Sequence, residues 1–282
     1  MVSSLFYSIP NVNPLRVILT RNATTLTGRT SSPHRPKPAP RRTPQRSYAG
    51  RTAAERRAER RERLLEAGLE LFGTDGYART PIERICAAAG VSTRNFYEEF
   101  SGREALLIAL HDRVTQRALD AVADALVADA VRAADAGRAA DAGPDGTPGG
   151  AGDSPAGRPL LIVPADRVRR RIEAGVDAYV TVLTSDPRWT RIASVELIGV
   201  SRAVEEHRRR WRALWAQLLE AETARITGRP VGGRPEFHLA AVAVIGAVNE
   251  LMLNWCTAGA DSPPQDMTAI IVRFIMGMLT AP

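Results

Sequence analysis

The chain has 282 residues, of which 44% are hydrophobic, and this is enough to build the core of a globular protein. Its net charge of +7 comes from residues 1–50, which hold eight basic residues and no acidic one, whereas the other 232 residues carry 30 basic and 31 acidic groups. The basic composition therefore does not by itself identify a nucleic-acid-binding protein, and any DNA-binding surface has to be local.

The sequence indicates neither a membrane span nor metal or disulfide chemistry. The longest apolar run, residues 239–248, is about half of the roughly 20 residues that a spanning helix needs, so we predict no membrane partner. Cys86 and Cys256 lie far apart in apolar helical patterns and form neither a zinc motif nor a disulfide framework. We expect both to be small buried residues in a reducing cytoplasm, and we predict no metal site and no cofactor.

Residues 1–50 are rich in Ser, Thr, Pro and Arg, have no helical period, and are predicted to be a disordered basic tail. Three interpretations stay open, in this order of preference. The start codon is assigned too far upstream, or the tail is a flexible arm that contacts DNA phosphates or the minor groove, or it is a targeting peptide.

Two amphipathic helices are predicted on either side of a short helical pair. The first begins near Arg56, ends at a glycine-rich turn over 73–76, and has one face formed by Leu65, Gly68, Leu69 and Phe72. The other starts at a capping box of Ser101 and Glu104, and its apolar face is formed by Leu107, Leu110, Val114 and Ala118.

The short pair lies between these helices. Thr80 is expected to cap the first member, with Glu83 completing a capping box. Gly90 then interrupts the helical period, and Ser92 can cap the second member, residues 93–100.

The rest of the chain is predicted to be helical around one loop. Residues 133–159 contain 19 Ala, Gly or Pro in 27 positions and no aromatic or large aliphatic residue, so a low-complexity loop is expected. Four or five helices follow, at about 165–184, 188–200, 202–227, 236–258 and 267–278. No strand-like alternation appears. We predict an all-α protein in which a three-helix N-terminal domain, residues 57–117, precedes a larger helical domain, residues 160–282.

Residues 81–100 fit a helix-turn-helix, with the turn at Gly90. Its two helices are expected to pack together through Ile82, Ile85, Val91, Phe96 and Phe100. The side chains left exposed at the start of the second helix are Thr93, Arg94, Asn95 and Tyr97. In a helix-turn-helix these positions meet base edges in the major groove. A plain helical hairpin is the structural alternative.

The exposed residue types suit DNA. Arg94 can donate two hydrogen bonds to guanine, Asn95 can pair with adenine, and Thr93 can contact a thymine methyl group or a phosphate. Thr80 and the N–H groups at both helix starts suit phosphate oxygens.

At these residues the chain resembles the TetR family of bacterial transcriptional regulators. The matching residues are Leu71-Phe72, Gly76-Tyr77, Thr80, Ile85, Ala88, Gly90-Val91-Ser92, Phe96-Tyr97, Phe100 and Arg103-Glu104-Ala105-Leu106. The match covers about 60 residues, and beyond them the chain resembles the family only in architecture. In two departures, Glu99 stands in place of the usual His, so no DNA contact is expected there, and Pro81 replaces the second threonine of the usual pair.

The resemblance implies that Thr93, Arg94 and Asn95 read bases, and that phosphates are held by Thr80, Ser92, Tyr97 and Arg103. It also implies a homodimer through residues 236–258 and 266–280. The sequence agrees independently, because both segments carry more apolar surface than one core is expected to cover, although burial within the monomer is the alternative. A twofold dimer places its recognition helices about 34–36 Å apart on double-stranded DNA and predicts a near-palindromic operator.

The resemblance further implies an unknown small-molecule effector in the C-terminal domain, whose binding releases DNA by shifting the protein between two states. Candidate pocket walls are Trp189, Trp211, Trp215, Trp255 and Phe237, and candidate polar anchors are Glu196, Asn249, Asn254 and His238. These residue types define neither the ligand nor the operator. The protein is then a ligand-responsive repressor of the bacterial cytoplasm, associated with the nucleoid when it is bound to DNA.

Three other functions are weighed against this one. A constitutive DNA-binding factor has no effector, and a receptor-like module is regulated by a partner protein. An enzyme is the remote alternative, but the four histidines fall in no H-E-x-x-H motif, and no G-x-S-x-G, phosphate loop or C-x-x-C occurs. We therefore predict no catalytic residue.

Overall fold

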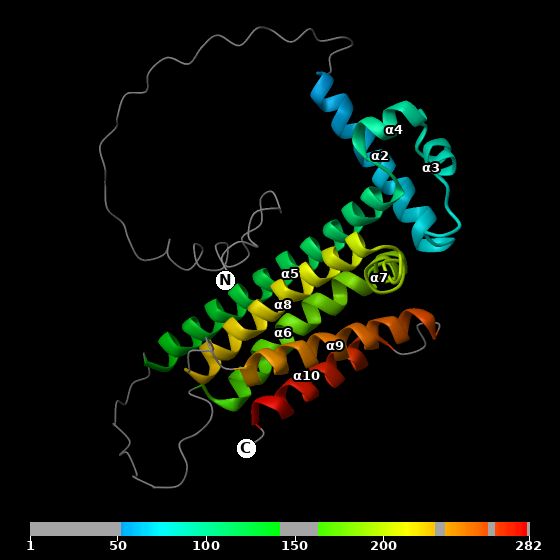
Figure 1. Ribbon diagram of the computed structural model, residues 1–282. Helices are drawn as coiled ribbons and strands as arrows, with labels where there is room; N and C mark the ends of the chain where they lie inside the picture. Colours follow the sequence, from blue (N-terminus) through cyan, green and yellow to red (C-terminus); the bar gives the residue numbers. More distant parts are fainter. Residues whose placement is uncertain (1–51, 142–162, 229–234, 259–262, 281–282) are drawn as a thin grey trace, which may run out of the picture. The chain divides into compact units, whose positions relative to one another are not determined.

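The computed structural model describes residues 52–141, 163–228, 235–258 and 263–280, and the regular structure of these residues is helical throughout (Figure 1). The all-α prediction is confirmed. The helices are α2 (Ala53–Thr74), α3 (Ile82–Ala89), α4 (Thr93–Glu99), α5 (Arg103–Asp141), α6 (Ala165–Thr184), α7 (Pro187–Ser194), α8 (Arg202–Thr227), α9 (Pro235–Thr257) and α10 (Pro264–Thr280). The predicted basic tail, residues 1–50, lies outside the described residues.

Two compact units divide between Arg60 and Arg61. In the first unit, the described residues 52–60 open α2 with a capping box. Thr52 N–H donates to Glu55 Oε2 at 2.6 Å, and Thr52 Oγ1 accepts from Glu55 N–H at 3.2 Å. The second unit contains two regions, which we call the head (residues 61–110) and the body (the remainder of α5 with α6 to α10).

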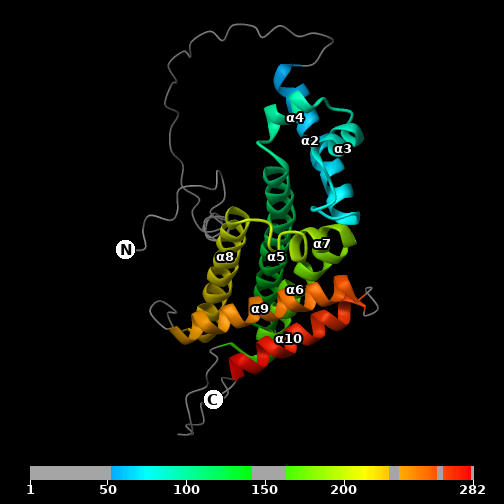
Figure 2. The same ribbon diagram turned by 45° about the vertical axis from the view of Figure 1, so that its right-hand side comes forward.

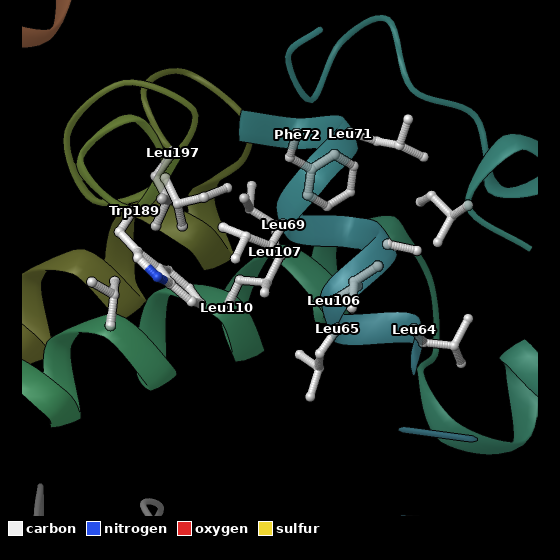
Figure 3. Close-up of a cluster of buried hydrophobic side chains, with 14 of the residues drawn as sticks. Leu64, Leu65, Leu69, Leu71, Phe72, Leu106, Leu107, Leu110, Trp189 and Leu197 are labelled. Carbon is white, nitrogen blue, oxygen red and sulfur yellow. The ribbon is translucent and has the colours of Figure 1, made fainter. Parts of the chain in front are cut away.

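The core of the head continues without a break into the body. Figure 3 shows leucines from α2 beside leucines of α5, with Trp189 and Leu197 on the far side of the cluster. The largest side chains with almost no exposure here are Leu64, Phe72, Leu106, Leu107, Leu110 and Leu197. Burial of this kind contributes about 1.5–3 kcal/mol for each large apolar side chain. The first turns of α5 thus hold the head, and the same helix continues into the body.

The body is a layered helical array. α6 packs against α5, α7 and α10, while α8 packs against α5 and α9. α9 and α10 run side by side in both views (Figures 1 and 2). α10 therefore packs on α6, whereas α9 packs on α7, α8 and α10.

The boundary of the predicted low-complexity loop needs correction. α5 continues to Asp141, so residues 133–141 are helical, and the remainder of the predicted loop lies outside the described residues. Five of these nine residues are alanine, which has the highest helix propensity, and an established helix adds such residues easily. Arg138 also pairs with Asp135 one turn earlier.

The apolar stretch of α9 is longer than the run over 239–248 on which the prediction of no membrane span was based. Residues 237–257 form 21 helical residues with a mean hydropathy of 1.6, which is long and apolar enough to cross a membrane. Most of this helix is not buried within the described chain. Leu239 and Val242 are exposed on it, and Ile270 and Phe274 are exposed on α10. An unpartnered apolar surface of this kind marks a binding surface of some type.

Candidate nucleic-acid interface

The turn between α3 and α4 is fixed by backbone geometry and by one arginine. Gly90 ends α3 with φ 60° and ψ 41°, a left-handed conformation that a residue with a Cβ atom adopts only with strain. The turn is closed by hydrogen bonds from Gly90 N–H to Ala87 O and from Val91 N–H to Cys86 O. From α2, Arg63 donates to Ala89 O at 3.2 Å. The predicted helix-turn-helix is therefore present as a braced unit.

α4 starts as predicted. The Ser92 hydroxyl accepts from Asn95 N–H at 3.2 Å and caps the helix. The five residues expected to pack the pair do so, because Ile85, Val91, Phe96 and Phe100 are buried and Ile82 is partly buried against them. Since Phe96 has no exposed surface, the opposite face of α4 is held outward.

That outward face carries the predicted base-reading residues. Thr93 and Arg94 are exposed and Asn95 is half-buried. The side chain of Arg94 is 90% exposed, and its contact with Glu98 is a loose 3.7 Å ion pair. Such a pair contributes little in water, so the guanidinium is available to another acceptor. Tyr97, the predicted phosphate-binding residue, is 55% exposed.

Thr80 has a different role from the one expected. It is fully buried, and its hydroxyl donates to Gly76 O at 2.8 Å. The residue before α3 is Pro81, which makes no side-chain cap. The Thr80 side chain therefore neither caps α3 nor faces a phosphate; it braces the loop between α2 and α3.

Arg103 is largely engaged within the protein. Its Nη1 atom donates to Thr80 O at 2.7 Å and to Tyr77 O at 3.2 Å, and its guanidinium lies 4.8 Å from the centre of the Tyr77 ring. Arg61 acts similarly, donating to Glu99 O at 3.0 Å while lying over the Phe100 ring. Arginines 61, 63 and 103 thus hold the backbone of the head. Sequence reasoning missed this role, because a carbonyl acceptor has no residue signature.

Comparison with known proteins bears on this geometry. The family profile of bacterial regulatory proteins of the tetR family matches residues 64–110. A curated relative, the uncharacterised HTH-type transcriptional regulator YerO of Bacillus subtilis, is 37% identical over 51 residues. The head therefore carries the sequence pattern of the tetR family. The YerO match spans 18% of each protein, so it concerns the head alone.

Solved structures extend the likeness to the fold of most of the chain. The fatty acid degradation regulator FadR from Bacillus halodurans aligns with a TM-score of 0.55 at 16% identity, over 78% of this chain and 94% of that one. FadR from Bacillus subtilis in complex with stearoyl-CoA aligns with a TM-score of 0.54 at 12% identity, over 77% and 98%. At these identities the likeness shows the shared fold.

The loop after α2 is tied to the end of α7. The Glu196 carboxylate accepts from Tyr77 N–H at 2.6 Å and from Arg191 Nε at 2.7 Å. Arg191 also donates to Thr74 O at 2.9 Å. Glu196, expected as an effector anchor, therefore connects body to head. Burial raises the pKa of Tyr77, whose ring packs edge-on against Phe72.

The body encloses a cavity of about 190 Å³ between α5, α6, α8, α9 and α10. Of the nine candidate walls and anchors, Trp211, Trp215 and Asn249 line it. Trp189 and Trp255 belong to the hydrophobic core instead, so their expected role is corrected. A smaller cavity of about 80 Å³, lined in part by Phe237, shares five wall residues with the larger one: Leu219, Thr223, Val244, Ile275 and Leu279.

Proposed function

We propose that this protein is a sequence-specific DNA-binding transcriptional regulator that reads the major groove with α4. The observation that carries the proposal is the exposed start of α4, where Arg94 projects beside Thr93 from a helix whose other face is locked by buried Phe96. A rigid helix with exposed polar residues at its N-terminus is what major-groove reading requires.

Each side chain has a matching acceptor or donor on DNA. Arg94 fits guanine O6 and N7, Asn95 fits adenine N6 and N7, and Thr93 fits a thymine methyl group or a phosphate. Ser92, Tyr97 and the N–H groups at the starts of α3 and α4 suit phosphates. Arg103 can also contact a phosphate, through those of its N–H groups that do not donate to backbone carbonyls.

A binding titration tests the proposal. The full chain is titrated against the DNA upstream of its own gene at several salt concentrations, beside the variants Arg94→Ala and Arg138→Ala. Arg138 lies near the end of α5 and is also strongly exposed, so its variant removes the same charge away from α4. We expect Arg94→Ala to cost about 1–3 kcal/mol at particular bases. Equal losses of DNA affinity in both variants would mean that binding depends only on overall charge, and this would refute the proposal.

The second part of the proposal is a homodimer through α9 and α10. Their exposed apolar residues, Leu239, Val242, Ile270 and Phe274, form a surface that a twofold partner of the same sequence can cover. The dimer sets two α4 helices about one turn of DNA apart, which predicts a near-palindromic operator.

Sedimentation tests the homodimer with a matched pair of variants. Val242→Arg is expected to give monomers, because it places a charge in the apolar contact. Val131→Arg, at a valine on α5 that is also about half exposed, should leave the dimer intact. If the wild-type chain sediments as a monomer and instead floats with phospholipid vesicles, α9 serves a membrane and the homodimer is refuted.

The third part is an effector that is mainly apolar. The charged groups on the cavity wall are already paired, Arg171 with Glu222 and both Arg208 and Arg212 with Glu205. Binding would therefore draw on apolar contacts and on the few polar groups such as Asn249. Because the two cavities share five wall residues, one elongated ligand can extend through both.

Stearoyl-CoA, which the B. subtilis FadR structure contains, is the first probe. We expect it to change the fluorescence of the wall tryptophans and to release DNA, as a repressor's inducer does, whereas coenzyme A without the acyl chain does neither. Ligand binding that leaves DNA affinity unchanged would favour the constitutive factor. Absence of binding by a broader set of apolar molecules would refute the apolar effector.

A further inference from the structure

Two histidines and a carboxylate meet between α5 and α8, although 96 positions separate the histidines in the chain. His111 Nδ1 lies 3.0 Å from His207 Nε2, and Asp112 Oδ1 lies 3.4 Å from the same His207 nitrogen. The three atoms all fall within 4.8 Å of one another. Sequence analysis predicted no metal site, because none of these residues falls in a ligand motif.

These separations match a shared metal ion. Two ligands bonded at about 2.0–2.1 Å lie about 2.9 Å apart at a right angle and about 3.3 Å apart at the tetrahedral angle. The observed 3.0 and 3.4 Å fall at these two values.

The surroundings keep the ligands in their binding forms. His111 and His207 are both buried, and a neutral imidazole has a lone pair to donate to a metal ion. Asp112 Oδ1 accepts from Trp211 Nε1 at 2.7 Å, which orients the carboxylate. It remains about half exposed, which gives an ion a path from solvent.

Two arginines lie near the site, and one of them is already paired. Arg208 faces His111 and Arg210 faces His207, and both disfavour a further cation. Arg208 is paired with Glu205 at 3.0 Å, and the Asp112 carboxylate supplies the negative charge closest to the site. Imidazole and carboxylate together suit Zn²⁺ and related ions rather than Ca²⁺ or Mg²⁺.

We propose that His111, Asp112 and His207 bind one divalent transition-metal ion, with Zn²⁺ the best fit. Three protein ligands leave a fourth position for water or another donor. Because the ligands come from α5 and α8, the ion fastens the helix that carries the head to the wall of the body. This site stands independently of DNA binding.

Metal titration of the tag-free, chelator-treated full chain tests the site. Co²⁺ is followed by its visible absorption and Zn²⁺ by calorimetry and by the shift in Tm. The wild type should bind one ion per chain and melt at a higher temperature with Zn²⁺. We expect Asp112→Asn and His207→Gln each to weaken binding at least tenfold. His238→Gln, at an exposed histidine that contacts Glu220, should leave binding unchanged.

Asp112→Asn keeps the proposal falsifiable if loss of a buried histidine unfolds the body. Its amide oxygen can still accept from Trp211, and circular dichroism checks that the variant is folded. The proposal is overturned if the wild type takes up no ion at micromolar Zn²⁺, or if folded Asp112→Asn binds as tightly as the wild type. It is equally overturned if His238→Gln loses the binding, since the ion then sits elsewhere.

Discussion

The head and the body of this chain are both helical, but they differ in how closely their helices are packed. In the head, short helices are held by arginines that donate to carbonyls and by aromatic rings without exposed surface. In the body, longer helices leave two adjoining cavities, an exposed apolar surface and buried ionisable groups. The head is packed so that its helices keep one geometry, whereas the body has an apolar surface and cavities that another molecule can occupy.

The largest expected difference between the regions is in how much unfolding free energy is lost when an aromatic ring is removed. Phe96→Ala removes a fully buried ring from the closely packed head, so we expect a loss of about 3–5 kcal/mol in unfolding free energy. Trp215→Ala should cost clearly less, because this ring is only partly buried and already borders the cavity. Urea unfolding of both variants measures the difference. Equal losses would mean that the body is packed as tightly as the head.

The next largest effect is expected from a substitution at the junction of the two regions. A Cβ atom at Gly73 would lie 2.6 Å from Arg188 Cβ, so Gly73→Ala should force α2 and α7 apart. We expect a loss of about 1–3 kcal/mol, the usual effect of overpacking. At Gly102 nothing lies within 4 Å of such an atom, so Gly102→Ala serves as the control in thermal unfolding. If both substitutions prove neutral, the two helices are not in firm contact.

The smallest expected effects are those of two glycine-to-alanine substitutions, which should change the free energy of unfolding in opposite directions. Gly90→Ala imposes a side chain on φ 60° and should destabilise the head by about 1–2 kcal/mol. Gly137→Ala, in α5 with open space around it, should stabilise the protein by up to about 1 kcal/mol through helix propensity. Chemical denaturation of the pair checks this. A loss in both variants would contradict the helical conformation at 137.

Local signals in the sequence predicted the head well. The Gly90 turn, the Ser92 cap and the packing of Phe96 and Phe100 each depend on neighbours within a few positions, and all were found. The role of Thr80 was missed because its hydroxyl binds carbonyl groups, whose positions depend on how the loop folds.

The body was predicted only in outline, because its important contacts join distant residues. The Glu196 contact with Tyr77 spans 119 positions, and no local sequence pattern predicts it. Which tryptophans face the cavity depends on how α5, α8 and α9 are set against one another. The extension of α5 to Asp141 was missed for another reason, since alanine is both a low-complexity residue and the strongest helix former.

The central claim is that the start of α4 reads bases, and selection from a random duplex DNA library tests it most directly. The full wild-type chain and Arg94→Ala are selected in parallel and the bound DNA is sequenced. The account predicts a near-palindromic sequence for the wild type, and for Arg94→Ala the same sequence with relaxed base preference at one position in each half. No enriched sequence for the wild type, or an identical preference in both proteins, would contradict it.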